Sequence, residues 1–423
     1  MLAKMMRLVG GSALGRGDVT LLYAAMFLSF LGTSVVFPLR LLYARTQHAT
    51  PVELGLMASS FLVAPVVAQL PAGWLVDRWG RVPVLMTGMV AHALISLLYI
   101  VLNTPLDLIG LRFVEGVSVA AIRPAVSAYI ADVTPEEHRS EAYGVLSATF
   151  SGGMLFGPLI GGVIGQYLGF AAAYGVNVAI EVVAVLLIWG RLREPAAQKV
   201  EVSGTADLAA GGVVPWRRLL SLPLLGAYLA ILCAQSVMGM MGALWSIWIS
   251  DLGGSEAYIG ATFTVFALPQ IFLGAFAGRM SDRFGRALLI TVPGVLVSVI
   301  YVSYGFVANL GWIMALGVLE GVIFVFGQPA AQGLLADASP PEARGRAQGL
   351  SGVIGALGGA SFAFASLPLY HVARPLPWIL AGVVMTIGSI VAGLGALAYE
   401  RRRHTAHALP LAAASASSGA AAR

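Results

Sequence analysis

Three charged side chains, Arg112, Glu115 and Arg123, lie in the interior of one largely apolar run of residues 107–131. At 100° per residue, they fall within roughly 80° of one another around a helix. A carboxyl group on such a face can bind and release a proton, and an arginine beside it favours the ionised form. One interpretation is that Arg112 holds Glu115 ionised until the surroundings rearrange and the carboxyl group takes up a proton. A permanently ionised structural pair is the alternative.

A second carboxyl group, Glu320, occupies the equivalent place in the other half of the chain, because the sequence repeats at a spacing of 205 positions. The clearest repeat is a nine-residue segment, Gly-x-x-x-Asp-Arg-aromatic-Gly-Arg, found at residues 73–81 and 278–286. Matching residues continue on both sides of it without an insertion, from Gly55 and Gly260 onward. Gly317 occupies the position equivalent to Arg112, so Glu115 has an arginine three residues before it and Glu320 does not.

The composition indicates that these groups lie in a membrane. Of the 423 residues, 58% are hydrophobic and 11% are charged, against about 25% charged in soluble domains. Apolar runs long enough to cross a bilayer must form helices, because lipid offers the backbone no hydrogen bonds. Twelve such runs are predicted, near residues 18–40, 55–75, 83–102, 107–131, 141–167, 171–190, 222–249, 258–277, 287–308, 311–335, 345–369 and 377–399.

The repeat divides these helices into two bundles of six. The predicted fold is an all-α membrane protein with pseudo-two-fold symmetry. Its predicted parts are an N-terminal bundle at 15–194, a cytoplasmic linker at 195–218, a C-terminal bundle at 219–403 and a disordered cytoplasmic tail at 404–423.

The charge distribution predicts the topology. Of the 25 Lys and Arg residues, 20 fall on the side of the predicted helices that holds both termini. Positive charge accumulates in cytoplasmic loops, so both termini are expected in the cytoplasm. This distribution also argues against nucleic acid as the partner of the net charge of +5.

The sequence gives no sign of enzyme chemistry. The single cysteine, Cys233, excludes disulfides and cysteine-based metal sites, and no two histidines are spaced as a ligand pair on a predicted membrane helix. No glycine-rich phosphate loop or nucleophile elbow is present. We therefore expect no catalytic residues, no metal and no cofactor.

With its repeat, topology and duplicated loop, the chain resembles the major facilitator superfamily of transporters from about residue 18 to 403. The resemblance implies a small-molecule substrate bound between the two bundles near the membrane midplane, with access alternating as the bundles rock. It also implies a protein that functions as a monomer in the lipid bilayer. The ratio of 23 Arg to 2 Lys suggests a GC-rich bacterial genome, so the expected location is a bacterial inner membrane.

In this family the duplicated loop latches the cytoplasmic side. The resemblance assigns Asp77 to a contact with a neighbouring helix, and Arg81 to an ion pair with Asp132. The alternative is that these residues merely follow the positive-inside rule and cap helices. The predicted gating residues are Gly73, Asp77, Arg78, Gly80, Arg81 and Asp132, with Gly278, Asp282, Arg283, Gly285, Arg286 and Asp337 as the second set.

The fifth predicted helix carries glycines at every fourth position, in a segment similar to the family's antiporter motif: Gly153, Gly157, Pro158, Gly161 and Gly162. That motif is typical of the drug:proton antiporter branch with twelve helices, and it favours export. A generic packing face between helices is the alternative.

Further residues are assigned by their place in the family's plan, in which the first, fourth, seventh and tenth helices line the cavity. The predicted cavity residues are Arg123, Gln235, Met238, Trp245, Trp248 and Gln328. Glu181 lies in a peripheral helix, where we expect it to be neutral or paired with Asn177. In the family, the motif around Arg112 and Glu115 is linked to proton coupling, so either Glu115 or Glu320 is expected to carry the proton.

The sequence therefore predicts a secondary transporter that exports small lipophilic compounds or drugs in exchange for protons. A transporter of a specific metabolite, sugar or lipid is the first alternative. A membrane sensor or a membrane enzyme is the second.

Overall fold

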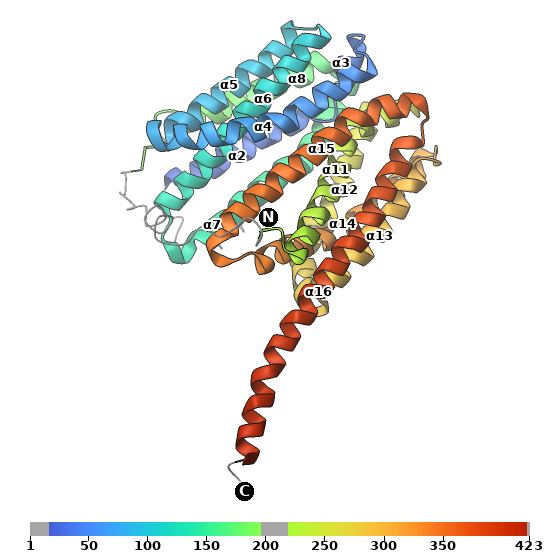
Figure 1. Ribbon diagram of the computed structural model, residues 1–423. Coiled ribbons are helices and arrows are strands. Elements are labelled where there is room, and N and C mark those ends of the chain that lie inside the picture. Colours follow the sequence, from blue (N-terminus) through green and yellow to red (C-terminus); the bar gives the residue numbers. More distant parts are fainter. Residues whose placement is uncertain (1–16, 196–218, 421–423) are drawn as a thin grey trace.

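The computed structural model describes residues 17–195 and 219–420, and within these ranges the chain forms helices joined by short turns. Figure 1 shows two bundles side by side, the first in blue to green and the second in yellow-green to red. The N-terminal bundle consists of α2 (Gly17–Val36), α3 (Arg40–Thr46), α4 (Pro51–Trp79), α5 (Arg81–Val101), α6 (Pro105–Val133), η1 (Glu136–His138), α7 (Arg139–Leu168) and α8 (Phe170–Ile188). The C-terminal bundle consists of α11 (Leu222–Asp251), α12 (Glu256–Phe284), α13 (Arg286–Tyr304), α14 (Leu310–Ala338), η2 (Pro341–Ala343), α15 (Arg344–Val372) and α16 (Leu376–Ala420).

This architecture confirms the predicted fold of two six-helix bundles. Among the described residues, eleven helical segments are long and apolar enough to cross a membrane, with α2 and α3 counted as one. The twelfth, α6, is as long as its neighbours but carries five charged residues: Asp107, Arg112, Glu115, Arg123 and Asp132. The predicted linker lies, apart from Pro195, outside the described residues.

The first span differs from its prediction at one end. A turn at residues 37–39 separates α2 from α3, and the span continues to Thr46. Pro38 lies in this turn and has no N–H to continue the helical hydrogen bonds. Arg40 therefore begins α3 inside the bundle, where it is 3% exposed, although the sequence suggested a place near the membrane face.

The end of the chain also differs from its prediction. A disordered tail is expected from residue 404, whereas α16 continues as a helix to Ala420 and extends beyond the bundles in Figure 1. The alanines of this segment have the highest helix propensity of any residue, and this favours continuation of the helix.

The duplicated loops lie at one end of the helices, which we call the motif face; the other end is the opposite face. Each loop is a single glycine between two helices: Gly80 joins α4 to α5 with φ of 99°, and Gly285 joins α12 to α13 with φ of 90°. Residues that carry a side chain rarely adopt such φ angles, so glycine makes these one-residue turns possible.

The bundles pack against each other at the opposite face and separate at the motif face. One buried apolar cluster, from Val35 to Met385, includes residues of both bundles, whereas the two clusters nearer the motif face each belong to a single bundle. At the opposite face, Gly55 abuts the Phe364 backbone and Gly260 abuts the Pro158 backbone. Near the motif face, Gly73 and Gly278 have open space where a Cβ would project. The molecule is therefore closed at the opposite face.

Candidate transport site

A cavity of about 360 Å³ lies between the two bundles. Its wall is largely apolar and rich in methionine and aromatic side chains. The lining residues are Phe37, Ser151, Met154, Met238, Met241, Gly242, Trp245, Thr262, Phe263, Phe266, Ala267, Gln270, Ile271, Gly317 and Glu320. Methionine and aromatic surfaces adapt to apolar ligands of varied shape. Glu320 is the one carboxyl group in this lining.

Glu320 projects from α14 and is 1% exposed. The Tyr304 hydroxyl of α13 donates a hydrogen bond of 2.8 Å to its Oε2 atom. Within the described part of the chain, no arginine, lysine or histidine forms an ion pair with it. A buried carboxyl group with a hydroxyl donor and no counter-charge is suited to exist in a protonated form.

Aromatic rings support this end of the cavity. The Trp245 indole N–H donates a hydrogen bond of 2.8 Å to Thr262, and the Trp245 ring packs edge-on against Tyr304 at 5.2 Å. Trp248 and Trp378 pack behind them with centroids 4.6 Å apart and ring planes tilted by 58°. This packing fixes the ring of Tyr304 and therefore the hydroxyl group that meets Glu320.

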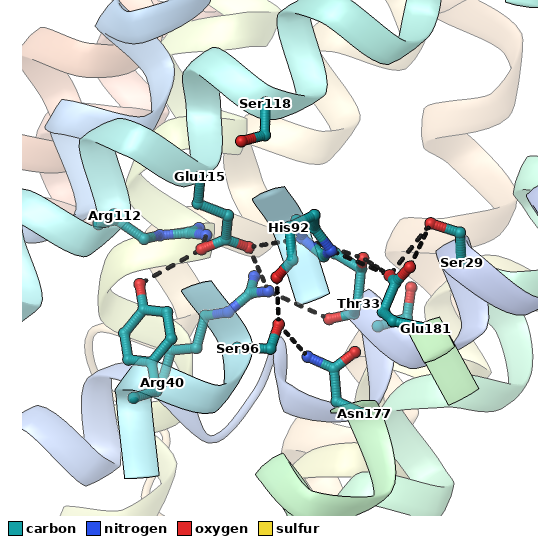
Figure 2. Close-up of polar contacts among 12 residues, drawn as sticks. Ser29, Thr33, Arg40, His92, Ser96, Arg112, Glu115, Ser118, Asn177 and Glu181 are labelled. Atoms are coloured by element: carbon teal, nitrogen blue, oxygen red, sulfur yellow. Dashed lines mark hydrogen bonds and ion pairs between the residues drawn. The ribbon is translucent and has the colours of Figure 1, made fainter. Parts of the chain in front are cut away.

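In the N-terminal bundle, Glu115 is enclosed by cations (Figure 2). Arg40 of α3 lies 2.6 Å from Oε1, and Arg112, one turn earlier on α6, lies 2.8 Å from Oε2. The Arg112 guanidinium also lies 3.9 Å from the centroid of the Phe61 ring. The structure thus brings Arg112 and Glu115 together as the sequence placed them, but it adds Arg40. Two arginines around one carboxylate favour the alternative of a permanently ionised structural group.

His92 of α5 extends this network to Glu181 of α8 (Figure 2). Its Nδ1 lies 2.9 Å from Glu181 Oε1, and its Nε2 lies 3.4 Å from Glu115 Oε1. Glu181 also accepts hydrogen bonds of 3.0 Å from Ser29. Asn177 donates instead to Ser96, so the expected Glu181–Asn177 pair does not form.

Sequence reasoning missed Arg40 and His92 as members of this network. One signal was available: both residues, like Glu181, are polar groups flanked by apolar helix residues. Groups of this kind normally face the bundle interior and pair with one another. Their partners come from helices that are distant in the sequence, so spacing within one helix could not reveal them.

The two motif loops form matching ion pairs. Arg81 Nε lies 2.7 Å from Asp132, and Arg286 Nε lies 2.7 Å from Asp337. Arg286 also approaches Asp282 at 3.5 Å. The Arg78 guanidinium lies 5.1 Å from the Trp74 ring centroid in α4, and that of Arg283 lies 5.4 Å from the Phe284 ring centroid in α12.

Two acids that the sequence did not single out cap the helices after these loops. The Glu194 carboxylate accepts hydrogen bonds from the backbone N–H groups of Arg81 and Val82, at 2.7 and 2.8 Å. Glu400 does the same for Arg286 and Ala287. Carboxylates at helix N-termini are stabilised by unpaired N–H groups and the helix dipole.

Asp77 is exposed and forms no hydrogen bond or ion pair with another described residue. Its expected contact with a neighbouring helix is absent in this conformation, in which the bundles are separated at the motif face.

The glycine stripe of α7 packs against α2 in the same bundle. A Cβ on Gly153, Gly157 or Gly161 would overlap the backbone of Leu31, Ser34 or Val35, respectively. Gly162 points away from α2 and abuts the Glu256 backbone in the other bundle. The stripe is thus a close-packing surface, while Pro158 and Gly162 contribute to the contact between bundles.

Polar contacts also hold the opposite face closed. Arg45, at the end of α3, lies 2.6 Å from Asp251 at the end of α11. Tyr370 of α15, in the same bundle as Asp251, donates a hydrogen bond of 3.0 Å to the other oxygen of Asp251 and so holds it in place. Another polar contact between the bundles lies deeper, where Thr264 donates to the Leu155 carbonyl at 2.7 Å.

Of the six predicted cavity residues, the structure places two in the cavity lining and four elsewhere. Met238 and Trp245 line the cavity, and Gln328 lines a smaller hollow of about 40 Å³ within the C-terminal bundle. Trp248 is buried behind Trp245. Gln235 and Arg123 are exposed side chains outside the cavity lining, and the Arg123 guanidinium lies 5.9 Å from the Phe150 ring centroid.

Comparison with known proteins places this architecture in a family. A sequence model described as the Major Facilitator Superfamily matches residues 22–250 and 227–421. The chain belongs to the major facilitator superfamily. It is therefore a multi-pass membrane protein and a transporter, with its cavity at the family's usual place between the bundles.

Individual relatives are similar in sequence or in fold over nearly the whole chain. Multidrug resistance protein 1 of Bacillus subtilis is 25% identical over 88% of this chain and 94% of its own length. The staphyloferrin B transporter of Staphylococcus aureus is 23% identical over 92% of this chain and 95% of its own. A bacterial homologue of the human lysosomal transporter Spinster, solved in an inward-facing and unoccupied conformation, shares the fold. Its TM-score is 0.73 at 14% identity, over 91% of this chain and 97% of that one.

Proposed function

We propose that this protein exports small lipophilic compounds from a bacterial cell in exchange for protons. The motif face is the cytoplasmic face, with both chain termini on that side, and the structure represents the state open to the cytoplasm. The protein acts as a monomer, since each chain holds a complete cavity between its own two bundles.

One observation carries the proposal: Glu320 is a buried carboxyl group without a basic partner, and it lies in the wall of the cavity. A proton and a substrate can therefore compete for the same space. A bound substrate can make the protonated state of Glu320 less favourable, or it can contact the ionised carboxylate directly. In either case the proton leaves. Exchange of one for the other is the requirement of antiport.

The other features support export of apolar compounds. Met154, Met238 and Met241 give the wall an adaptable apolar surface. The glycine pattern of α7 is that of the antiporter motif, and a relative similar over most of the chain is named a multidrug resistance protein.

A panel of compounds tests the proposal. Purified protein in detergent, weakly buffered near pH 7, should release protons when a lipophilic dye is added, and proteoliposomes should accumulate dye when a proton gradient is applied. Glu320→Gln should abolish both responses. Glu342→Gln, which changes an exposed carboxyl group of η2, is the matched control and should retain both. Dye transport that remains proton-driven in Glu320→Gln would remove Glu320 from the mechanism.

Export of one specific metabolite is the second candidate, because the chain is also similar to the staphyloferrin B transporter over most of its length. The same panel separates the two. A multidrug exporter moves several unrelated dyes, whereas a metabolite transporter moves none of them and responds to one class of compound.

A further inference from the structure

The His92 imidazole is 1% exposed and lies between two carboxyl groups of different helices (Figure 2). Its Nδ1 faces Glu181 Oε1 at 2.9 Å, and its Nε2 faces Glu115 Oε1 at 3.4 Å. The Thr33 hydroxyl of α2 is also within 3.5 Å of Nε2. A histidine in this position can bind a proton between two acids.

The charged and titratable groups around His92 come from four elements. Glu115 and Arg112 belong to α6, Arg40 to α3, Glu181 to α8, and Tyr99 to α5 itself; α2 contributes the hydroxyl groups of Ser29 and Thr33. Both arginines contact Glu115. Glu181 has no arginine or lysine contact among the described residues, so His92 is its one partner able to carry positive charge.

Both protonation states of the imidazole have a full set of hydrogen bonds. In the neutral form, Nδ1–H donates to Glu181, and Nε2 accepts from Thr33. In the cationic form, Nε2–H donates to Glu115, and the Thr33 hydroxyl turns to Glu181, which lies 3.4 Å away. A neutral imidazole has one donor and one acceptor, whereas the cation has two donors. A proton can thus enter or leave without movement of the backbone.

The charge balance keeps this proton exchangeable. Arg40 and Arg112 offset Glu115 and Glu181, so the cluster is neutral when His92 is neutral. A proton on His92 leaves one positive charge in excess inside the membrane. The cost of such a charge there opposes the attraction of the two carboxyl groups, so the proton can leave when either contact is weakened.

The same carboxylate oxygen connects this site to the closed opposite face. Glu115 Oε1 binds Arg40 at 2.6 Å and faces His92 at 3.4 Å. Arg40 is the first residue of α3, and Arg45, five residues later in the same helix, pairs with Asp251 of the other bundle. A cationic His92 competes with Arg40 for Glu115, and any shift of Arg40 moves the short helix that carries Arg45.

We propose that His92 and Glu181 form a second proton-binding site, buried in the N-terminal bundle, and that a proton bound there favours opening of the opposite face. The site is separate from Glu320, and it acts on the conformational equilibrium rather than on the cavity. The proposal does not require that Glu320 exchange protons with a substrate.

Spin labels at Val101 and Phe306 test whether a proton at His92 and Glu181 favours opening of the opposite face. These positions are equivalent in the two bundles, lie at the opposite face and are 67% and 70% exposed. The single native cysteine, Cys233, is first replaced by serine. Distances are measured by electron spin resonance in nanodiscs between about pH 5.5 and 8.0, the range in which histidine titrates. The ratio of open to closed opposite face should rise about fivefold or more as the pH falls, a typical allosteric coupling.

Four variants assign the effect. His92→Gln and Glu181→Gln should remove the pH response. His138→Gln changes a histidine outside the network and should retain it. Glu320→Gln should also retain it, even where it abolishes substrate-driven proton release, so the two proposals fail separately. A pH response that persists in both His92→Gln and Glu181→Gln, or no response in the starting protein, overturns the proposal.

A second measurement covers the case in which these variants do not fold. Replacing the other five histidines of the chain by glutamine leaves His92 as the only imidazole. Its ring ¹⁵N resonances in membranes should report both protonation states across the same pH range. A single state throughout would contradict a site that binds and releases protons.

Discussion

Glu115 and Glu320 are equivalent residues, 205 positions apart, and their neighbours give them different chemistry. Each accepts a hydrogen bond from an equivalent tyrosine, Tyr99 or Tyr304. Three other neighbours differ between the halves: Arg40 corresponds to Trp245, Arg112 to Gly317 and His92 to Val297. The N-terminal bundle therefore holds a carboxylate fixed by cations, and the C-terminal bundle holds a carboxyl group free of them.

This difference predicts that the same substitution has unequal effects on stability at the two positions. Glu115→Gln removes the counter-charge of two buried arginines and should lower stability by about 3–5 kcal/mol, as when one partner of a buried ion pair is lost. Glu320→Gln removes no counter-charge and should change stability by less than about 1 kcal/mol while abolishing proton coupling. Thermal unfolding of the two purified variants, side by side, measures the contrast. Equal stability losses would show that Glu115 is not the fixed anion that we describe.

Among the elements, α7 is positioned by its glycines. Gly153, Gly157 and Gly161 allow its backbone to touch α2, and the opposite side of α7 packs on α12 of the other bundle. The α7 helix thus connects the bundle core to the surface on which the bundles move. Any side chain on the stripe must push α7 towards α12.

Gly161→Ala should therefore destabilise the protein by about 1–3 kcal/mol, the usual cost of overpacking, because its Cβ overlaps the Val35 carbonyl. Gly175→Ala in α8 is the control, since a Cβ there meets open space. Unfolding temperatures in detergent measure both. If the two variants are equally stable, close packing is not the purpose of the stripe, and a direct role in export gains support.

The short helix α3 connects the buried network to the opposite face. Arg45 is 46% exposed and Asp251 is 18% exposed, so their ion pair is partly screened by water. Its contribution is about 0.5–1 kcal/mol. That is small against the stability of a bundle but sufficient to bias two conformations of similar energy.

Arg45→Ala should accordingly raise the ratio of open to closed opposite face by about two- to fivefold. Cysteine labels at the opposite face, or the spin-label pair described above, report this ratio. Gln47→Ala changes a residue just beyond α3, whose side chain hydrogen-bonds to Thr46, and should leave the ratio unchanged. An unchanged ratio in Arg45→Ala would mean that apolar packing alone closes this face.

For the whole molecule, the three apolar clusters describe one end point of a rocking motion. The cluster shared by both bundles must split for the opposite face to open, and the surfaces around Gly73 and Gly278 must then meet. Asp77 is exposed in the present state, and we expect it to contact a neighbouring helix in the state in which the motif face is closed. The ion pairs of Arg81 and Arg286 lie within single bundles, so they can persist in both states.

Asp77→Asn should leave the present state intact and disfavour the other one. Loss of a charge-assisted hydrogen bond of about 1.5–3 kcal/mol would lower the population with a closed motif face about tenfold or more, and it would slow transport. Spin labels at Trp79 and Phe284, equivalent and exposed positions of the two loops, measure that population. Asp282→Asn, in the second copy, is the informative comparison. Normal transport by Asp77→Asn at normal expression would contradict the latch.

Much of the large-scale organisation was predictable because a membrane restricts the choices. Apolar runs of sufficient length must be helices, and the repeat divides them into two bundles. The local pairing of Arg112 with Glu115 followed from helical spacing. The break before Arg40 and the helical end of α16 did not follow, since the apolar pattern alone does not show where one helix pauses or how far it continues.

The sequence by itself determined the class of molecule, the two equivalent acids and the two duplicated loops, since these depend on composition and on spacing within a repeat. The tertiary structure decided which acid is enclosed by cations and which lies in the cavity wall. It also joined His92 to Glu181 and Arg45 to Asp251. The reason is physical: the charge state of a buried group depends on neighbours a few ångströms away, and those neighbours come from helices that only packing brings together.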